Sequence, residues 1–254
     1  MEVDINGLSN IFEKTLQLKS SDEVMEIPTN RTVQTEDTGK MFEMAICKAY
    51  NIQYNGKYKY DMALADKLYT RLQTLKQHFP QCTHTAKAGS PFDFTADCDT
   101  GLHLSAKTCK KGQAKVAPQV IGQAKPEKLC NILNIVYTSV DDLKCYIQNN
   151  ISTVLHLMIE HTFKCPNIYY HNQRDSIKFI KMIDYIDWDS YAYTWTRNWN
   201  DWKNSTVCKV VLNDKNVAIA EFQVHEKNRK NMAIRFFYDN ILELFKSHFE
   251  IIDF

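Results

Sequence analysis

The sequence predicts a mixed α/β fold of the α+β kind, with a central mixed β-sheet flanked by helices. Three observations lead to this prediction. Apolar residues recur at helical spacing in the first ninety residues, a strand–turn–strand pattern follows, and the chain after Cys165 is rich in aromatic and β-branched residues. Helices, a hairpin, another helix and then more strands make an element order typical of mixed folds. The C-terminal part from residue 166 is therefore expected to be β-rich.

Several segments before Cys165 have the 3.6-residue periodicity of amphipathic helices. Apolar series over 42–50 and 62–75 predict two helices in the N-terminal part. The polar segment 20–40, rich in Thr and Glu, is expected to be a loop. Another helix should begin at Pro126, because proline suits the first helical turn. A long apolar stripe over 143–159 predicts further helix.

Strand patterns fall into two groups. Residues 92–97 and 102–109 are predicted strands, and the intervening residues 98–101 (CDTG) favour a turn, so the pair should form a hairpin. The second group lies beyond Cys165, and the apolar spacing over 241–249 then indicates a closing helix. The strands of the second group are expected at 167–171, 176–183, 207–212, 217–225 and 232–237.

The composition is that of an ordinary folded protein outside the membrane. Apolar residues make up 44% of the 254 residues, which allows a sizeable core. No apolar run approaches the roughly 20 residues that a membrane span needs. The first ten residues lack the basic-then-apolar layout of a secretory signal, so we expect a cytoplasmic protein with no membrane partner. The 8 cysteines include no C-x-x-C pair, which favours reduced thiols over structural zinc.

The signatures of several other enzyme classes are absent. The sequence has no G-x-x-x-x-G-K-[ST] loop, so ATP-driven translocation is not expected, and it has no H-E-x-x-H or G-x-S-x-G motif. The histidines lack metal-ligand spacing. His78 and His84 flank Cys82, but with one thiol the spacing is more simply a coincidence.

The sharpest local signal lies on the predicted hairpin. Asp93 is early on its first strand and Lys107 is late on its second, so the two should lie close together. Phosphodiester hydrolysis needs carboxylates that hold Mg²⁺, a metal-activated water, and a cation that orients this water or steadies developing charge. An aspartate and a lysine at the ends of paired strands can supply much of this chemistry.

This arrangement resembles the PD-(D/E)XK nuclease superfamily, whose pattern is an aspartate, a strand-and-turn spacer and then acid-x-lysine. Asp93 matches the aspartate and Lys107 the lysine, whereas Ser105 stands where the superfamily usually has an acid. The resemblance implies that Asp93 holds Mg²⁺, that Lys107 orients the attacking water and that the missing acid comes from elsewhere. Glu43 is the natural substitute, because many members carry a glutamate on a helix before the hairpin. The other possible donors are Asp97 and Asp99.

A lysine-rich segment follows the candidate site. Between Lys107 and Lys128 the only acid is Glu127, and a polar turn is expected over 117–123. Such a segment suits contact with a phosphate backbone, and it also resembles a segment that follows the catalytic lysine in some type II restriction enzymes. The candidate DNA-binding residues here are Lys110, Lys111, Lys115, Gln119 and Gln123.

The strand pair over 220–237 is a second candidate DNA-binding element. Its first strand alternates, which places polar side chains on one face and apolar ones in the core. Gln, His and Arg side chains can read base edges in the major groove, and basic residues can bind phosphates. A similar segment recurs near the C-terminus of type II restriction enzymes. The candidate residues are Gln223, His225, Arg229, Lys230 and Arg235.

A rival active site also lies in this region. Asp214, Glu221 and Gln223 form a D…E-x-Q pattern, and some PD-(D/E)XK enzymes carry glutamine in place of the lysine. If this were the true site, the hairpin with Asp93 would be structural. We favour the first site because it keeps the lysine, precedes a basic loop and follows a glutamate-bearing helix.

Together these features indicate a type II restriction enzyme, a sequence-specific double-stranded DNA endonuclease that uses Mg²⁺. Residues 1–165 are predicted to form the catalytic domain and residues 166–254 the DNA-recognition region, and a homodimer is a common assembly for such enzymes. One alternative is a sequence-specific nucleic-acid-binding protein without nuclease activity, since Ser105 departs from the pattern. A structure-selective repair nuclease is the other.

Overall fold

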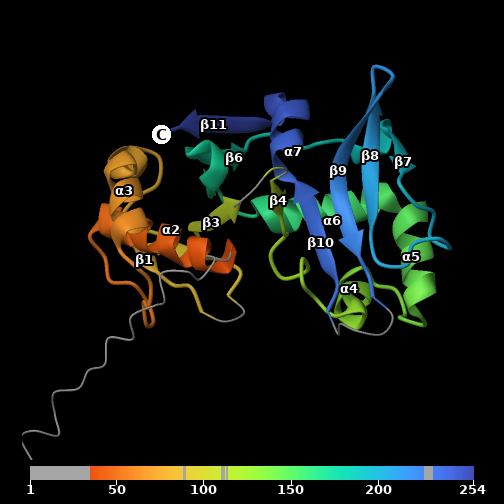
Figure 1. The fold of residues 1–254 in the computed structure, drawn as a ribbon, viewed down its shortest axis with the longest axis horizontal. Coiled ribbons are helices and arrows are strands. Elements are labelled where there is room, and N and C mark those ends of the chain that lie inside the picture. The colour runs from red at the N-terminus through yellow and green to blue at the C-terminus, as the bar shows by residue number, and fades with distance from the viewer. Residues whose placement is uncertain (1–34, 88–89, 110–111, 113, 226–230) are drawn as a thin grey trace, which may run out of the picture. The chain divides into compact units, whose positions relative to one another are not determined.

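The computed structural model describes residues 35–87, 90–109, 112, 114–225 and 231–254, which form a mixed α+β fold. This described part contains six α-helices and two β-sheets (Figure 1). The predicted fold class is therefore confirmed. Four of the candidate DNA-binding residues lie outside the described residues: Lys110, Lys111, Arg229 and Lys230.

The first sheet contains the predicted hairpin and has six described strands in the order β1-β2-β3-β5-β6-β11. Strand β3 pairs antiparallel with β2 and parallel with β5, so the sheet is mixed, as predicted. The sheet draws three strands from beyond residue 165, and the functional division proposed at that residue stays a prediction. The strands are β1 Cys82–His84, β2 Phe94–Ala96, β3 His103–Cys109, β5 Asn167–His171, β6 Ser176–Met182 and β11 Phe249–Asp253.

The second sheet is antiparallel throughout and has five described strands in the order β4-β10-β9-β8-β7. Its longest strand, β9, ends at Gln223 and pairs with both β8 and β10. The predicted C-terminal hairpin is thus formed by β9 and β10. The strands are β4 Lys115–Val116, β7 Ala192–Trp195, β8 Thr206–Leu212, β9 Lys215–Gln223 and β10 Ala233–Phe237.

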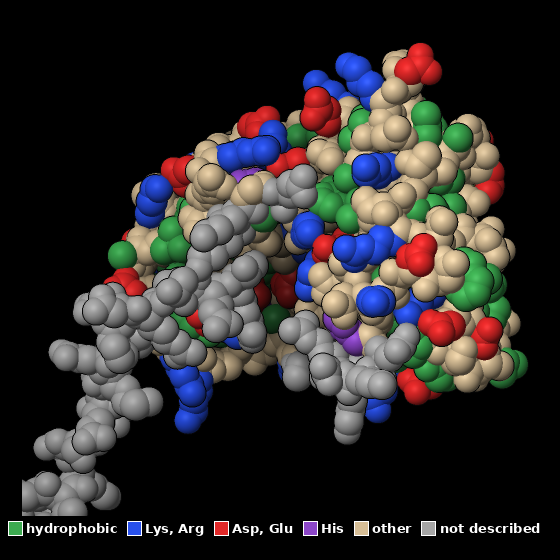
Figure 2. Space-filling view, turned by 45° about the vertical axis from the view of Figure 1, so that its right-hand side comes forward, with side chains coloured by type: hydrophobic (Ala, Val, Ile, Leu, Met, Phe, Trp, Pro, Cys, Tyr) green, Lys and Arg blue, Asp and Glu red, His purple; other side chains and the backbone are tan. Residues whose placement is uncertain are grey.

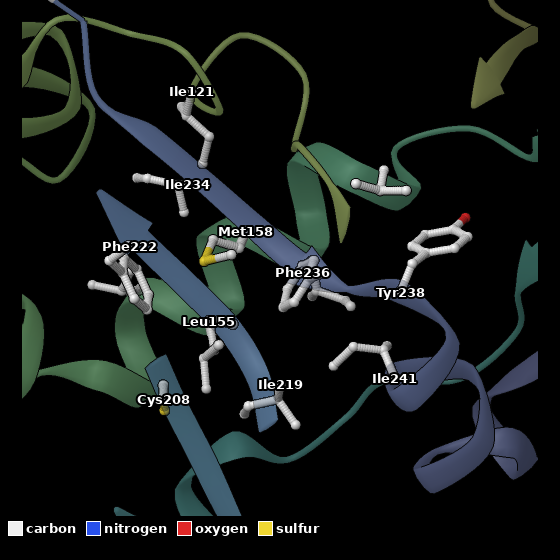
Figure 3. Packing of buried hydrophobic residues seen from close by; sticks show 14 of the residues in the cluster. Ile121, Leu155, Met158, Cys208, Ile219, Phe222, Ile234, Phe236, Tyr238 and Ile241 are labelled. Carbon is white, nitrogen blue, oxygen red and sulfur yellow. The ribbon is translucent and has the colours of Figure 1, made fainter. Parts of the chain in front are cut away.

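Helices cover both sheets and close two hydrophobic clusters. The helices α2 (Thr35–Tyr50) and α3 (Ala63–Arg71) pack on the first sheet through a cluster that includes Phe42 and Leu68. The helix α6 (Ile151–Phe163) belongs to a second cluster, which it shares with residues of both sheets. Figure 3 shows Met158 and Leu155 of α6 directed at the β9–β10 pair, where Phe222 and Phe236 lie.

The remaining helices begin and end where local sequence signals place them. The helix α4 (Pro126–Ile132) starts with proline, as predicted, and α5 (Val140–Asn149) is capped by Ser139, whose hydroxyl accepts from the backbone N–H of Asp142. The apolar stripe over 143–159 is divided between α5 and α6, because Asn150 between them has a non-helical backbone (φ −125°, ψ 40°).

Two predictions of local structure are wrong. The segment 20–40 was expected to be a loop, but α2 already begins at Thr35; the remainder of that segment lies outside the described residues. The closing helix α7 (Tyr238–Leu244) ends before Phe249, which begins strand β11 instead. Strand β11 pairs antiparallel with β6 and so forms the edge of the first sheet.

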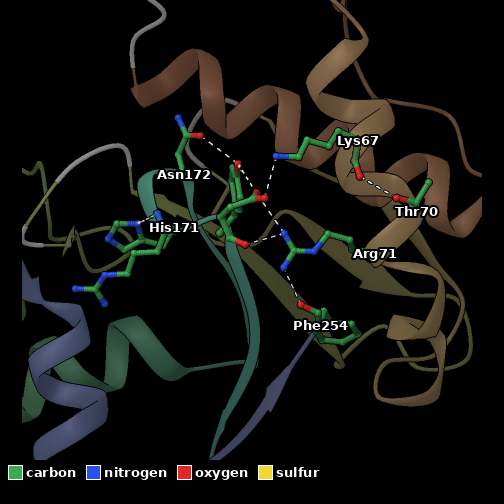
Figure 4. A network of polar contacts seen from close by, with 9 residues as sticks. Lys67, Thr70, Arg71, His171, Asn172 and Phe254 are labelled. Carbon is green, nitrogen blue, oxygen red and sulfur yellow. Dashed lines mark hydrogen bonds and ion pairs between the residues drawn. The ribbon is translucent and has the colours of Figure 1, made fainter.

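A polar network ties α3 to the turn between β5 and β6 and to the end of β11 (Figure 4). Arg71 donates through Nη1 to the backbone oxygen of Asp175 and through Nη2 to that of Phe254, each over 2.8 Å. Lys67 Nζ lies 2.9 Å from the Asp175 carboxylate. Because Asp175 is in the left-handed region (φ 47°), the turn is tight and its carbonyl faces the helix. The network holds α3 against the sheet that contains the predicted hairpin.

Most of the cysteine side chains lie in the core. All eight cysteines are free thiols, and six of them are buried, as expected for reduced residues in a core. In the described ranges we find no helix with the length and apolar character that a membrane crossing requires.

Candidate active site

The hairpin opens beside Asp93. Strands β2 and β3 pair only at Phe94–Leu104 and Thr95–His103, and beyond Leu104 strand β3 continues with β5 on its other side. Asp93 lies just before β2. Its Oδ2 accepts a hydrogen bond from the backbone N–H of Ala106 in β3 over 2.7 Å, a bond that the backbone of a neighbouring strand would otherwise accept. The chain therefore places a carboxylate at the free edge of β3, at Ala106, one residue after the start of the parallel pairing at Ser105.

Ser105 orients this carboxylate. Its hydroxyl donates to Asp93 Oδ2 over 2.9 Å, and it accepts in turn from Gln119 Nε2 over 2.6 Å. Ser105 is almost completely buried, at 1% exposure. Ser105, at the position of the usual acid, is thus a hydrogen-bond partner of Asp93, and its hydroxyl proton is donated to that carboxylate.

Lys107 lies on the same side of β3 as Ser105, because side chains alternate along a strand. Burial lowers the pKa of the Lys107 ammonium, and the nearby charges of Asp93 and Glu43 oppose that shift. Burial likewise raises the pKa of the Asp93 carboxyl, which Lys107 lowers and Glu43 raises further. Asp93 and Lys107 therefore share one poorly solvated environment, which is typical of functional sites, and the charge of Glu43 acts on both.

Glu43 comes from α2, whose residues Phe42 and Ile46 are buried in the cluster beside the first sheet. Its Oε2 lies 3.3 Å from His84 Nε2, and Tyr54 Oη donates to the same atom over 3.4 Å. The side chain of Glu43 remains 16% exposed. Its carboxylate is therefore held in place and still reachable from solvent.

These residues fit a magnesium ion. Both hydrogen bonds to the Asp93 side chain within the described residues end on Oδ2, which leaves Oδ1 for a ligand. Mg²⁺ in nucleases and related enzymes takes one or two carboxylates and completes its shell with water and substrate phosphates. No group of three or more His, Cys, Asp or Glu side chains within the described ranges could hold a metal alone. Asp93 and Glu43 would supply two carboxylates beside a substrate phosphate, which matches the usual ligands of Mg²⁺.

The other candidate acids lie elsewhere. Asp97 is four residues from Asp93, about 13 Å along an extended chain, and accepts from the Thr83 hydroxyl over 2.8 Å. Asp99 is exposed and accepts from the backbone N–H of Gly101 within the hairpin turn. Neither residue is placed beside Lys107.

The rival pattern is spread along one strand. Asp214 lies in the turn between β8 and β9, with φ 60°, whereas Glu221 lies near the other end of β9. Lys215 follows Asp214 directly, and the six residue steps from Lys215 to Glu221 span about 20 Å at roughly 3.3 Å each, so the two acids are at least that far apart along the strand. Two carboxylates that far apart cannot share a metal ion, so the D…E-x-Q pattern does not form a site in this fold.

Glu221 has a different set of partners. Lys115 Nζ lies 2.9 Å from Glu221 Oε1, and Arg235 Nη1 lies 3.3 Å from Oε2. Lys115 also lies 5.0 Å from the ring centroid of Phe237. Two of the candidate DNA-binding cations are therefore paired with one nearly buried carboxylate, at 7% exposure, and a phosphate would compete with it for them.

Arg235 also lies close to two further candidates. Gln123, His225 and Arg235 line one groove of about 500 Å³ at the end of the β9–β10 pair. His225 Nε2 is buried there and has no hydrogen-bond partner among the described residues. Gln223 lies at the end of β9, opposite Ala233. On the face drawn in Figure 2, lysine and arginine side chains are interspersed with acidic ones, as the net charge of +1 suggests.

The loop 117–124 links this groove to Asp93. Gln119 reaches Ser105 from it, and four residues later Gln123 lines the groove. The loop is held on the second sheet, because the backbone N–H of Ile234 in β10 donates to the carbonyl of Gly122 over 2.9 Å. A DNA contact by Gln119 stays a prediction, since its amide is engaged by Ser105 in this structure.

Gly122→Ala is expected to destabilise the fold by about 1–3 kcal/mol, because a methyl group there has no room. A Cβ at this position would lie 2.4 Å from the backbone oxygen of Pro118. The free energy of unfolding from urea titration measures the effect. Gly39→Ala is the matched control, since its Cβ would meet only Thr108 Oγ1 at 3.6 Å, an ordinary contact. Equal midpoints for the two variants would contradict the prediction.

His84 and Tyr54 are the residues of the site that the sequence did not reveal. They contact Glu43 from 41 and 11 residues away along the chain, and their own neighbours form no motif. Only the pairing of β1 with β2, which places His84 opposite Phe94, brings the histidine next to the hairpin.

Comparison with known proteins adds a further finding. The chain is 39% identical over 220 residues to the type II restriction enzyme CviAII of Paramecium bursaria Chlorella virus 1. The aligned region covers 85% of this chain and 62% of that enzyme, so the chain spans less than two thirds of the relative's length. No family model matches the chain, and no solved structure matches it. Most of this chain is thus similar to part of a type II restriction enzyme.

Proposed function

We propose that the protein is a sequence-specific double-stranded DNA endonuclease of the type II restriction kind, which hydrolyses phosphodiester bonds with Mg²⁺. The observation that carries this proposal is the Asp93 carboxylate hydrogen-bonded at the open edge of β3, with Lys107 on that strand and the charges of Lys107 and Glu43 near enough to shift the pKa of Asp93. The similarity to a type II restriction enzyme over 85% of the chain supports it. The PD-(D/E)XK pattern accounts for two of these three residues, and Glu43 supplies the acid that Ser105 lacks.

The side chains divide the chemistry among them. Asp93 and Glu43 would hold the metal, with Ser105 fixing the orientation of Asp93. When bound, Mg²⁺ polarises the phosphate and lowers the pKa of a bound water. Lys107, a cation in a poorly solvated place, orients the attacking water and stabilises the charge that develops on the phosphate.

We place DNA recognition on the second sheet and on the loop before it. The groove lined by Gln123, His225 and Arg235 offers an amide, an imidazole and a guanidinium, which are groups that read base edges. Gln223 lies on β9 and Lys115 on β4, the two strands that flank β10. Lys110, Lys111, Arg229 and Lys230, which lie outside the described residues, are proposed to contact phosphates, as is Lys115. This keeps catalysis mainly in residues 1–165 and recognition mainly in 166–254, with a homodimer as the proposed assembly.

The test is a digest of plasmid DNA by the purified chain with Mg²⁺, and again with the metal removed by a chelator. Discrete fragments that require Mg²⁺ are the expected result. A smear of random sizes would contradict sequence specificity, and cleavage confined to junctions or lesions would indicate a repair nuclease. Intact plasmid of reduced mobility under both conditions would contradict nuclease activity and favour a DNA-binding protein.

A further inference from the structure

The carboxylate of Glu43 is held by a buried histidine. His84 ends β1, and its side chain is fully buried, at 0% exposure. The imidazole lies between two aromatic rings, with centroid distances of 4.5 Å to Tyr54 and 5.0 Å to Phe94. Its Nε2 faces Glu43 Oε2 at 3.3 Å. The ring therefore has little freedom to turn away from the glutamate.

The location of the ring proton follows from the other nitrogen. The backbone N–H of Asn55 donates to His84 Nδ1 over 2.8 Å, so Nδ1 must be the unprotonated acceptor. A neutral imidazole then carries its proton on Nε2, which becomes a donor to Glu43. Both ring nitrogens are thus engaged, and neither is left to bind a metal ion itself.

We propose that His84 is a positioning residue for Glu43: a backbone amide fixes its tautomer, and the resulting Nε2–H aims the glutamate carboxylate at the metal site. This inference rests on the proposed function, because it takes Glu43 as a metal ligand. Tyr54 supplies a second and longer hydrogen bond to the same oxygen, at 3.4 Å. Partners that orient a ligating side chain typically change metal affinity 10- to 100-fold when they are removed.

Two substitutions of His84 separate its two hydrogen bonds. In His84→Gln the amide nitrogen stands near the place of Nε2 and can still donate to Glu43. In His84→Asn the amide oxygen stands near the place of Nδ1 and can accept only from Asn55. We expect the binding of Mn²⁺ alone, measured by titration calorimetry on the full chain, to weaken by roughly 10- to 100-fold in His84→Asn and by only a few-fold in His84→Gln.

His171 provides a matched control. It is also buried, at 1% exposure, it accepts a backbone N–H from Arg174 at Nδ1 over 3.2 Å, and its Nε2 lies 3.9 Å from Asp239. The same two substitutions at His171 should change thermal stability by similar amounts and leave Mn²⁺ affinity unchanged. The proposal would be overturned if the variants at His84 and at His171 lost Mn²⁺ affinity only in proportion to their loss of thermal stability.

A measurement on the unaltered chain avoids the risk that a variant fails to fold. Nitrogen-15 NMR of labelled histidines distinguishes the tautomers, and we expect His84 to be neutral with its proton on Nε2. A proton on Nδ1 would overturn the inference. Glu43→Gln separates the two proposals: unchanged Mn²⁺ affinity in that variant removes Glu43 from the metal site. Weakened affinity there, with wild-type affinity in both His84 variants, refutes the role of His84 alone.

Discussion

Lys107→Ala is expected to reduce DNA cleavage by roughly 100-fold or more while DNA binding is retained. Lys107 lies on β3 beside Asp93, in a place where burial lowers the pKa of its ammonium. Its removal takes away the cation that orients water and balances charge at the phosphate. It does not alter the groove at the β9–β10 pair, where we place recognition. Single-turnover cleavage and a gel-shift titration measure the two properties separately.

The pH dependence of the variant distinguishes two roles for this lysine. Lys107 lowers the pKa of Asp93, so its loss should raise that pKa further and weaken metal binding at neutral pH. If raising the pH restores full cleavage to Lys107→Ala, the lysine serves only to keep Asp93 ionised, and our assignment is wrong. Lys178→Ala is the control, because this lysine lies in the same sheet, two strands from Lys107, and pairs with Asp253 at 2.6 Å instead of with a residue of the site.

Local patterns in the sequence predicted most of the fold. The hairpin, α4 and the five strands predicted beyond Cys165 each have a turn, a cap or an alternation of their own, and the structure confirms them, whereas β7 was not predicted. The patterns failed where tertiary pairing decides. Strand β1 spans three residues and β4 spans two, too few for periodicity, and they exist because β2 and β10 lie beside them. The predicted closing helix was extended to Phe249, which continues the apolar spacing of α7 but begins strand β11.

The candidate site was predictable to the extent that it lies on one hairpin. Asp93, Ser105 and Lys107 are brought together by a local turn, whereas Glu43 was placed there through the resemblance to a nuclease superfamily. The structure puts Glu43 in the electrostatic environment of Asp93, and its catalytic role stays a prediction. His84 could not be found from sequence, because its contact with Glu43 depends on how α2 packs on β1.

Asp93→Asn is expected to abolish cleavage and to make the metal-free protein more stable at neutral pH. Burial raises the pKa of Asp93, so its protonated form is favoured in the folded state. The stabilising contribution of such a group is present at low pH and is lost as the pH rises through the folded-state pKa. Asparagine resembles the protonated form and can still accept from Ser105 and Ala106. Thermal melting should therefore show a higher Tm, by roughly 2–4 °C for each kcal/mol recovered.

The Tm of Asp93→Asn should differ from that of the wild type in its dependence on pH and on Mg²⁺. The difference in Tm should shrink as the pH falls toward the range where the wild-type carboxyl is itself protonated. Excess Mg²⁺ should stabilise the wild type and leave Asp93→Asn unchanged, since ligands stabilise the state that binds them. Asp97→Asn, on the same hairpin but hydrogen-bonded to Thr83, is the control and should retain cleavage. A lower Tm in Asp93→Asn at neutral pH would mean that Asp93 is a structural carboxylate whose charge the fold requires, and the metal site would then have to lie elsewhere.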